Sequence, residues 1–155
     1  MPGSEDAESL TEDPALSPEA EAWGAFQNRL PKVPEEDVLD VDDFRVTPGG
    51  SYSYYLKRIA TEGTRLRGRA ITIFAIADKE GTVTLVSDPK IDLGVPSQGY
   101  DLGGKYNIVS SKVYRGNVKV PQGGKILSAQ VLAWDEANKE LVFQKKIVIG
   151  GPRGE

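Results

Sequence analysis

Three arginines alternate with small or apolar residues in the segment 65–70, and their spacing is the clearest sign of possible chemistry. Arg65, Arg67 and Arg69 project from one face if the segment is extended, because successive side chains of a strand point to opposite sides. Other basic and tyrosine residues lie on neighbouring predicted strands: Lys57, Arg115, Tyr54 and Tyr114. A basic surface with aromatic side chains on a small β-domain is typical of single-stranded nucleic-acid binding. The alternative is the solvated outer face of a sheet, with the tyrosines at strand ends or in the core.

The sequence contains no cysteine and no histidine, which excludes several kinds of site. Disulfides, thiolate nucleophiles and Cys-ligated zinc need cysteine, and Ser-His-Asp triads and His-ligated metals need histidine. Acid–base chemistry by paired carboxylates, lysine chemistry and carboxylate-bound Ca²⁺ or Mg²⁺ remain open. No motif is complete, so no catalytic residue, metal ligand or cofactor is assigned.

A long connection between predicted strands, residues 87–104, is rich in Gly, Pro, Ser and Asp. Connections longer than about 12–15 residues are often functional. Gly99, Gly104 and Lys105 have the spacing of a phosphate-binding loop, but Tyr106 replaces the Ser or Thr of that motif, and a strand should follow instead of a helix. We interpret the glycines as turn residues. Three loop aspartates could bind Ca²⁺ or serve a carboxylate-based hydrolase, although their spacing matches no calcium loop and solvated acids are the simpler interpretation: Asp88, Asp92 and Asp101.

Charge divides the chain into an acidic and a basic part. Residues 1–44 contain 13 acidic and 2 basic residues, a net of −11, and residues 45–155 contain 10 acidic and 17 basic residues, a net of +7. Residues 1–16 have too few apolar side chains to offset chain entropy, so they are predicted to be disordered. A flexible acidic arm could cover the basic part and compete with an anionic ligand.

A short helix is predicted within the acidic part, over residues 18–29. Ser17 can cap it, Pro18 fits its first position, and Pro31 ends it. Spacings of three and four residues give it a narrow apolar stripe: Trp23, Phe26 and Leu30. So short a helix needs a surface to dock against. That surface is either the β-domain of the same chain or a protein partner, and both interpretations stay open.

From about Leu39 to Ile149 apolar residues tend to recur at every second position, which indicates β-strands. The predicted strands are 38–46, 52–59, 65–77, a return strand from Val83, 106–120 with a bulge, 125–134 and 140–149. About seven or eight short strands without helical segments between them predict an antiparallel β-sandwich or small barrel. We therefore expect an all-β domain at 38–150 behind a mostly disordered acidic tail at 1–37.

Three runs of the β-domain occur in a recognisable order. They are YSYYL at 52–56, GRAITI at 68–73 and YRGNVKVP at 114–121, followed by a strand around 129–131. Residues 51–149 thereby resemble the C-terminal β-domain of an uncharacterised bacterial family whose members carry an N-terminal membrane anchor and a coiled coil. We expect this chain to depart from the family in having neither. The resemblance implies an interaction domain facing the cell envelope, and it brings no assigned activity.

The leading hypothesis is a non-catalytic β-sandwich that binds a protein partner, as the soluble part of a bacterial envelope protein. The alternative is a domain that binds nucleic acid or another polyanion and is restrained by its acidic tail. A carboxylate-based hydrolase is third. Transmembrane helices need about 18 or more apolar residues, and no such run is present. A periplasmic or envelope-associated location is expected if the sequence is a piece of a longer protein, and a cytoplasmic one otherwise.

Overall fold

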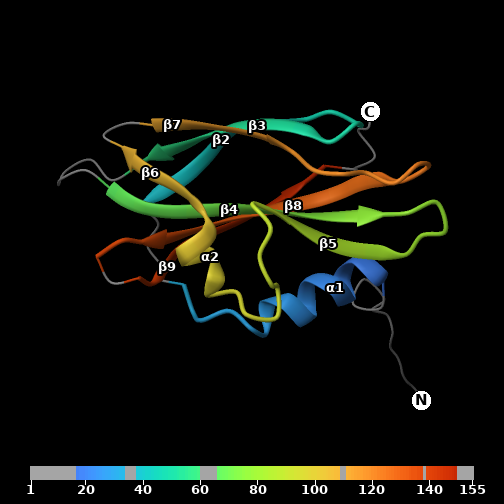
Figure 1. Ribbon diagram of the computed structural model, residues 1–155, viewed down its shortest axis with the longest axis horizontal. Coiled ribbons are helices and arrows are strands. Elements are labelled where there is room, and N and C mark those ends of the chain that lie inside the picture. The colour runs from blue at the N-terminus through green and yellow to red at the C-terminus, as the bar shows by residue number, and fades with distance from the viewer. Residues whose placement is uncertain (1–16, 34–37, 60–65, 109–110, 138, 150–155) are drawn as a thin grey trace, which may run out of the picture.

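The computed structural model describes residues 17–33, 38–59, 66–108, 111–137 and 139–149. These residues form two antiparallel sheets packed face to face, one of three strands and one of five, with two short helices (Figure 1). The elements in chain order are α1 (Pro18–Gln27), β2 (Leu39–Val46), β3 (Ser51–Arg58), β4 (Leu66–Ala77), β5 (Val83–Asp88), α2 (Gln98–Leu102), β6 (Gly104–Ile108), β7 (Ser111–Asn117), β8 (Lys125–Asp135) and β9 (Leu141–Val148). The predicted all-β antiparallel sandwich is confirmed.

The order of strands is β2-β3-β7 in the three-stranded sheet and β5-β4-β8-β9 in the five-stranded sheet. The strand β4 holds the larger sheet together because it pairs with three strands. One of its edges pairs with β8, while the other edge pairs with β6 over residues 66–70 and with β5 over residues 72–77. Residues 70–77 are all buried, as a strand covered on both faces requires, and their sequence AITIFAIA is almost wholly apolar.

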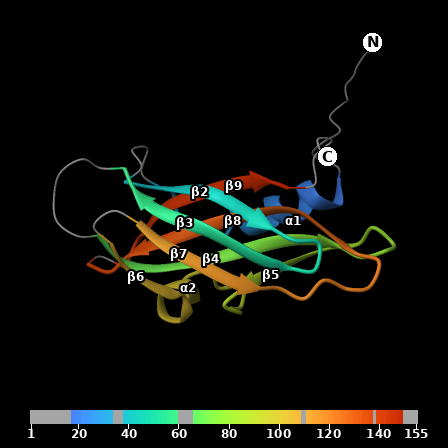
Figure 2. The same ribbon diagram turned by 90° about the horizontal axis from the view of Figure 1, so that it is seen from above.

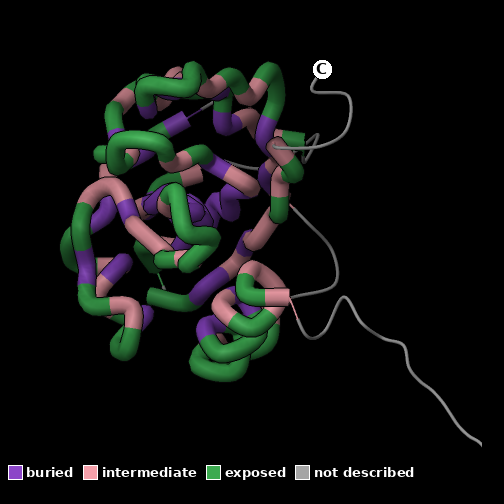
Figure 3. Tube along the Cα trace, turned by 90° about the vertical axis from the view of Figure 1, so that its right-hand side faces the viewer, coloured by how far each residue is buried: buried purple, intermediate pink, exposed green. Residues whose placement is uncertain are grey.

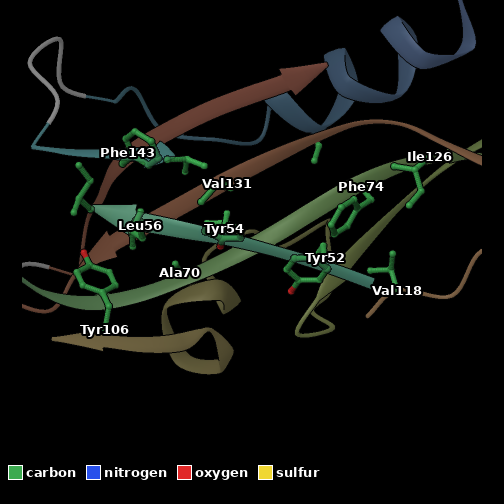
Figure 4. Close-up of a cluster of buried hydrophobic side chains, with 14 of the residues drawn as sticks. Tyr52, Tyr54, Leu56, Ala70, Phe74, Tyr106, Val118, Ile126, Val131 and Phe143 are labelled. Carbon is green, nitrogen blue, oxygen red and sulfur yellow. The ribbon is translucent and has the colours of Figure 1, made fainter. Parts of the chain in front are cut away.

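The first core lies between the two sheets and is rich in aromatic rings. Figure 4 shows Tyr52, Tyr54 and Leu56 extending from β3 into this core. The ring of Tyr54 stacks on Phe44 with a centroid separation of 5.3 Å, and the ring of Tyr52 lies 5.0 Å from Phe74. Alternation of apolar and polar residues on β3 therefore places one set inside and the other set on the outer face of the sheet. Figure 3 shows the buried, intermediate and exposed residues along the whole described trace.

The second core lies on the face of the five-stranded sheet that points away from the other sheet. Here α1 packs against apolar side chains of β4 and β8, including Ile73 and Leu132. The Ser17 hydroxyl caps the helix by accepting a hydrogen bond from the Ala20 amide at 3.0 Å. The helix ends at Gln27, two residues before the predicted end, because the amides of Arg29 and Leu30 bond to carbonyls three residues back and close a tighter turn.

The structure corrects two predicted elements. Residues 106–120 do not form one bulged strand, because β6 pairs with β4 and β7 pairs with β3 in the other sheet. The long connection at 87–104 contains the end of β5 and the helix α2, which the sequence pattern did not predict. Irregular pairing occurs instead in three other strand pairs. In one of them, β2 with β3, the register shifts between Asp42 and Arg45, and Asp43 has a φ of 54°. The disorder predicted for residues 1–16 lies outside the described residues.

Candidate anion-binding site

The basic residues predicted to share a surface lie on two opposite faces of the sandwich. Arg67 and Arg69 lie on β4 and project from the outer face of the five-stranded sheet, since the alternate residues Gly68 and Ala70 point inward. Lys57 on β3 and Arg115 on β7 project from the outer face of the three-stranded sheet, because their neighbours point into the core. The prediction of one shared surface is therefore wrong. Strand alternation predicts whether a side chain points into the core or outward, but it does not predict to which of the two sheets the strand belongs. Arg65 lies outside the described residues.

The two tyrosines of the predicted basic surface belong to the core. The side chain of Tyr54 is 1 % exposed, and its hydroxyl shares a 2.9 Å hydrogen bond with the Thr72 hydroxyl. Tyr114 is half-buried, stacks on Tyr54 with a centroid separation of 5.4 Å, and donates a hydrogen bond to the Gly104 carbonyl at 2.9 Å. Burial raises the pKa of both phenols. They therefore offer no stacking surface for a nucleic acid. Their burial agrees with the other interpretation, in which the tyrosines belong to the core.

The apolar stripe of α1 packs against the chain's own sheet. Trp23 is 4 % exposed and Phe26 is 1 % exposed, and half-buried Leu30 packs against the same cluster. The Trp23 indole donates a 2.8 Å hydrogen bond to the Ser128 hydroxyl of β8, and that hydroxyl donates in turn to the Glu19 carboxylate. In this structure the three side chains are therefore not available to a partner, and the partner-docking interpretation is corrected to intramolecular docking.

A small hollow lies on the outer face of the five-stranded sheet, where β4, β6 and α2 meet. Its volume is about 280 Å³. We call it the basic hollow, and its lining residues are Arg67, Gly68, Arg69, Tyr100, Lys105, Tyr106, Asn107 and Glu136. Two of the predicted arginines thus share a site with Lys105 and Tyr100, two residues that were considered only as parts of a loop.

The pairing of β4 with β6 sets the charge of the basic hollow. Arg69 lies directly opposite Lys105, and Arg67 lies opposite Asn107. Side chains that are directly opposite in an antiparallel pair are about 4.5–5.5 Å apart at Cβ, and like charges in such positions destabilise the pair. Arg69 partly offsets this by donating from Nη1 to the Gly103 carbonyl at 3.1 Å. The sheet nevertheless holds two cations side by side and a third one along the same strand.

Acidic side chains do not neutralise these cations within the described part of the chain. The salt bridges found there join Arg45 to Asp43, Lys57 to Asp42, and Lys145 to Asp40, all outside the basic hollow. Glu136 is the single carboxylate in the lining, against three cations. The arrangement can therefore bind an anionic group, because the guanidinium of arginine binds carboxylate or phosphate with two parallel hydrogen bonds.

Two glycines give the basic hollow its shape. A Cβ on Gly68 would lie 1.8 Å from the Trp134 carbonyl oxygen and 2.6 Å from the Tyr106 hydroxyl. Only glycine at this position therefore lets β4 and β8 lie so close to each other beneath the basic hollow. A Cβ on Gly99 would lie 2.3 Å from the Trp134 ring, so this glycine lets α2 rest on the indole. Tyr100, the next residue, thereby forms one wall, and Lys139 lies 5.6 Å from the centre of its ring.

The acidic residues of the 87–104 segment do not converge on a site. The Asp88 carboxylate accepts a 2.5 Å hydrogen bond from the Tyr52 hydroxyl, and the Asp92 carboxylate accepts one from the Gly94 amide at 2.8 Å. Within the described ranges, no three acidic residues are grouped so that they could hold a metal ion. The phosphate-loop interpretation also fails, because the helix α2 precedes Lys105 and a strand follows it, which reverses the order that the motif needs.

Comparisons of the chain with protein-family models, with curated proteins and with solved structures find no match. The resemblance to a membrane-anchored coiled-coil family therefore stays a prediction, as does the envelope location that it implies. In the described ranges, neither helix is long and apolar enough to cross a bilayer.

Proposed function

We propose that this chain is a non-catalytic binding module that holds an acidic segment of a partner protein in the basic hollow. The observation that carries the proposal is the placement of Arg69 directly opposite Lys105, with Arg67 beside them and no ion-paired acid among the described residues. Two like charges on adjacent strands destabilise the free domain. An anionic ligand removes that repulsion, so this local arrangement is more favourable in the complex than in the free protein.

The dimensions of the basic hollow favour a side-chain carboxylate over an extended polynucleotide. A single-stranded nucleic acid needs a basic track with several aromatic rings on which successive bases stack. The basic hollow has a volume of about 280 Å³, and one half-buried tyrosine, Tyr100, forms its wall. One or two Glu or Asp side chains fit such a space, with the Tyr100 ring packing against their methylene groups.

The test is binding of a fluorescein-labelled peptide of alternating Glu and Gly, measured by fluorescence anisotropy at low salt. The double variant Arg67→Gln/Lys105→Gln removes two exposed cations of the basic hollow and leaves Arg69, which bonds to the main chain. Its matched control is Lys57→Gln/Arg115→Gln, with the same change of net charge on the opposite face. We expect the first variant to bind roughly tenfold more weakly or worse, and the control to bind like the wild type.

Equal weakening by both variants would show non-specific attraction to net charge, and no binding by the wild-type domain at low salt would reject the proposal outright. In a parallel arm residues 1–16 are removed, which tests whether this acidic segment competes for the same cations. The charge boundary alone would place the end of this deletion at residue 44. The fold does not allow so long a deletion. Residues 18–27 form α1 and residues 39–46 form β2, so the longer deletion would remove part of both cores.

One observation favours polyanion or nucleic-acid binding as a second candidate. On the outer face of the three-stranded sheet, Arg45 and Arg115 lie on either side of Ser53 in one row across the strands. In the next row, Tyr55 is 42 % exposed. This candidate predicts that a labelled single-stranded oligonucleotide binds the wild type with a steep salt dependence. It also predicts that Lys57→Gln/Arg115→Gln, and not the hollow variant, abolishes this binding.

A further inference from the structure

A second hollow lies between the end of α1 and the loop before α2, where Pro31 and Pro96 approach Trp134. Figure 1 shows this loop passing the segment that follows α1, while Figure 2 shows that the helices α1 and α2 themselves lie apart. The volume of the hollow is about 410 Å³, and we call it the Trp134 hollow. It is larger than the basic hollow and differs from it in chemistry.

The inner lining of the Trp134 hollow is apolar. Trp134 and Leu141 are each 3 % exposed and belong to the second core, so they form its floor. The two prolines, Pro31 and Pro96, contribute to its walls. A concave space that is mainly apolar, with a few placed polar groups, is suited to an apolar side chain of a ligand.

The rim of the Trp134 hollow is cationic. Arg29, Lys32 and Lys139 line the hollow and are exposed, and they face the single carboxylate of Glu140. In the part of the chain that the structure describes, none of these four groups takes part in a salt bridge. A positive rim around an apolar floor is complementary to an apolar side chain with acidic neighbours.

Lys139 is held at this rim in a backbone conformation that lysine rarely adopts. Its φ is 57°, and its amide donates to the Asp135 carbonyl at 2.7 Å in the turn between β8 and β9. Glycine and asparagine adopt such a conformation more readily. Uncommon backbone conformations tend to cluster at binding sites and other functional sites. The position of Lys139 therefore agrees with a role in binding.

The Trp134 hollow and the basic hollow are neighbours. Tyr100 lines the basic hollow, Lys139 lines the Trp134 hollow, and the Lys139 Nζ lies 5.6 Å from the centre of the Tyr100 ring. A segment that leaves one hollow over these two side chains therefore enters the other. Each hollow contributes three cations and one carboxylate, so the positive charge continues from one to the other.

We propose that the Trp134 hollow binds an apolar side chain, with acidic neighbours, from the same partner segment whose carboxylate occupies the basic hollow. The proposal rests on the proposed function and adds to it the character of the partner: an acidic segment that carries an apolar residue close to its acidic contact. Acidic side chains alone leave the apolar floor uncovered. A leucine that covers the floor strengthens binding by roughly tenfold or more.

The test uses the labelled Glu–Gly peptide and a series of peptides in which one leucine replaces each glycine in turn. At least one leucine position should strengthen binding to the wild type roughly tenfold in fluorescence anisotropy at low salt. Arg29→Gln/Lys32→Gln should remove this gain. Lys57→Gln/Arg115→Gln makes the same change of net charge on the opposite face and should keep it. Circular dichroism spectra equal to that of the wild type show that both variants are folded.

The indole N–H signals of the two tryptophans provide a second measurement. Trp134 lines the hollow, whereas the Trp23 indole donates to the Ser128 hydroxyl within the second core. In a nitrogen–proton correlation spectrum, the best leucine peptide should shift the Trp134 signal and leave the Trp23 signal in place. The Glu–Gly peptide should shift the Trp134 signal less.

The outcomes separate this proposal from the proposed function. If the Glu–Gly peptide binds through Arg67 and Lys105 but no leucine position strengthens its binding, the Trp134 hollow is not a subsite and the proposed function stands. If Arg67→Gln/Lys105→Gln binds every peptide like the wild type, the proposed function is wrong. A leucine gain that appears only after removal of residues 1–16 would show that the chain's own acidic segment occupies the Trp134 hollow, and would overturn its assignment to a partner.

Discussion

The substitution Phe26→Ala tests whether α1 is an integral part of the fold or a detachable segment. Phe26 is 1 % exposed, and its ring lies 6.4 Å from that of Trp23 over the outer face of the five-stranded sheet. Truncation of a fully buried phenylalanine to alanine typically destabilises a protein by about 3–5 kcal/mol, the sum of lost burial and the cavity left behind. For a domain with a total stability of about 5–15 kcal/mol, this is a large fraction.

The size of the effect depends on what undocking of α1 would expose. If the helix could leave the sheet at little cost, loss of the Phe26 ring could not destabilise the rest of the domain by more than the docking free energy. Undocking also exposes apolar side chains of the sheet, including Ile73 and Leu132, which are 0 % exposed. At about 25 cal/mol per Å² of apolar surface, both sides of this contact oppose undocking. We therefore expect a loss of about 3 kcal/mol.

The measurement is urea unfolding followed by tryptophan fluorescence and by far-ultraviolet circular dichroism. The two signals should change together in the wild type and in Phe26→Ala, because the helix and the sheets unfold as one unit. Ala25→Ser is the control on the exposed side of the same helix and should change the free energy of unfolding by about 0.5 kcal/mol at most. A loss below about 1 kcal/mol for Phe26→Ala, or a separate early transition of α1, would refute the reasoning.

Three further predictions concern the sheets. Gly68→Ala should lower the free energy of unfolding by about 3 kcal/mol in a urea titration, because its Cβ would lie 1.8 Å from the Trp134 carbonyl oxygen. Burial raises the pKa of four core tyrosines above the ordinary value of 10.0, so the unfolded state alone releases these protons above pH 10. The free energy of unfolding, measured by urea titration, should therefore fall by about 1.4 kcal/mol per pH unit for each of them. These tyrosines are Tyr52, Tyr54, Tyr106 and Tyr114. Burial raises the pKa of Asp40, but hydrogen bonds from Lys145 and the Val41 amide outweigh it and hold that pKa below 3.8. Asp40→Asn should therefore lower the urea midpoint at neutral pH, and the difference should vanish as the pH falls below that value.

Local patterns of the sequence were sufficient to predict the strands and the inner and outer sides of most of them. The alternation of Tyr52, Tyr54 and Leu56 with polar residues places all three on one side of β3, and the apolar leucine indicates that this side is the core. The helix α1 followed from its cap and proline. The helix α2 has five residues and no apolar period, so no local pattern could have predicted it.

The basic hollow was beyond local patterns because it depends on pairing between distant segments. Arg69 and Lys105 are adjacent because β6 pairs with the same edge of β4 as β5 does, a choice that the strand sequences do not specify. Arg67 and Arg115 are both on outer faces, but on different sheets, and alternation cannot distinguish one sheet from the other. The useful local signal was the glycine-rich segment at 99–104, whose small residues let α2 and the sheet approach each other closely.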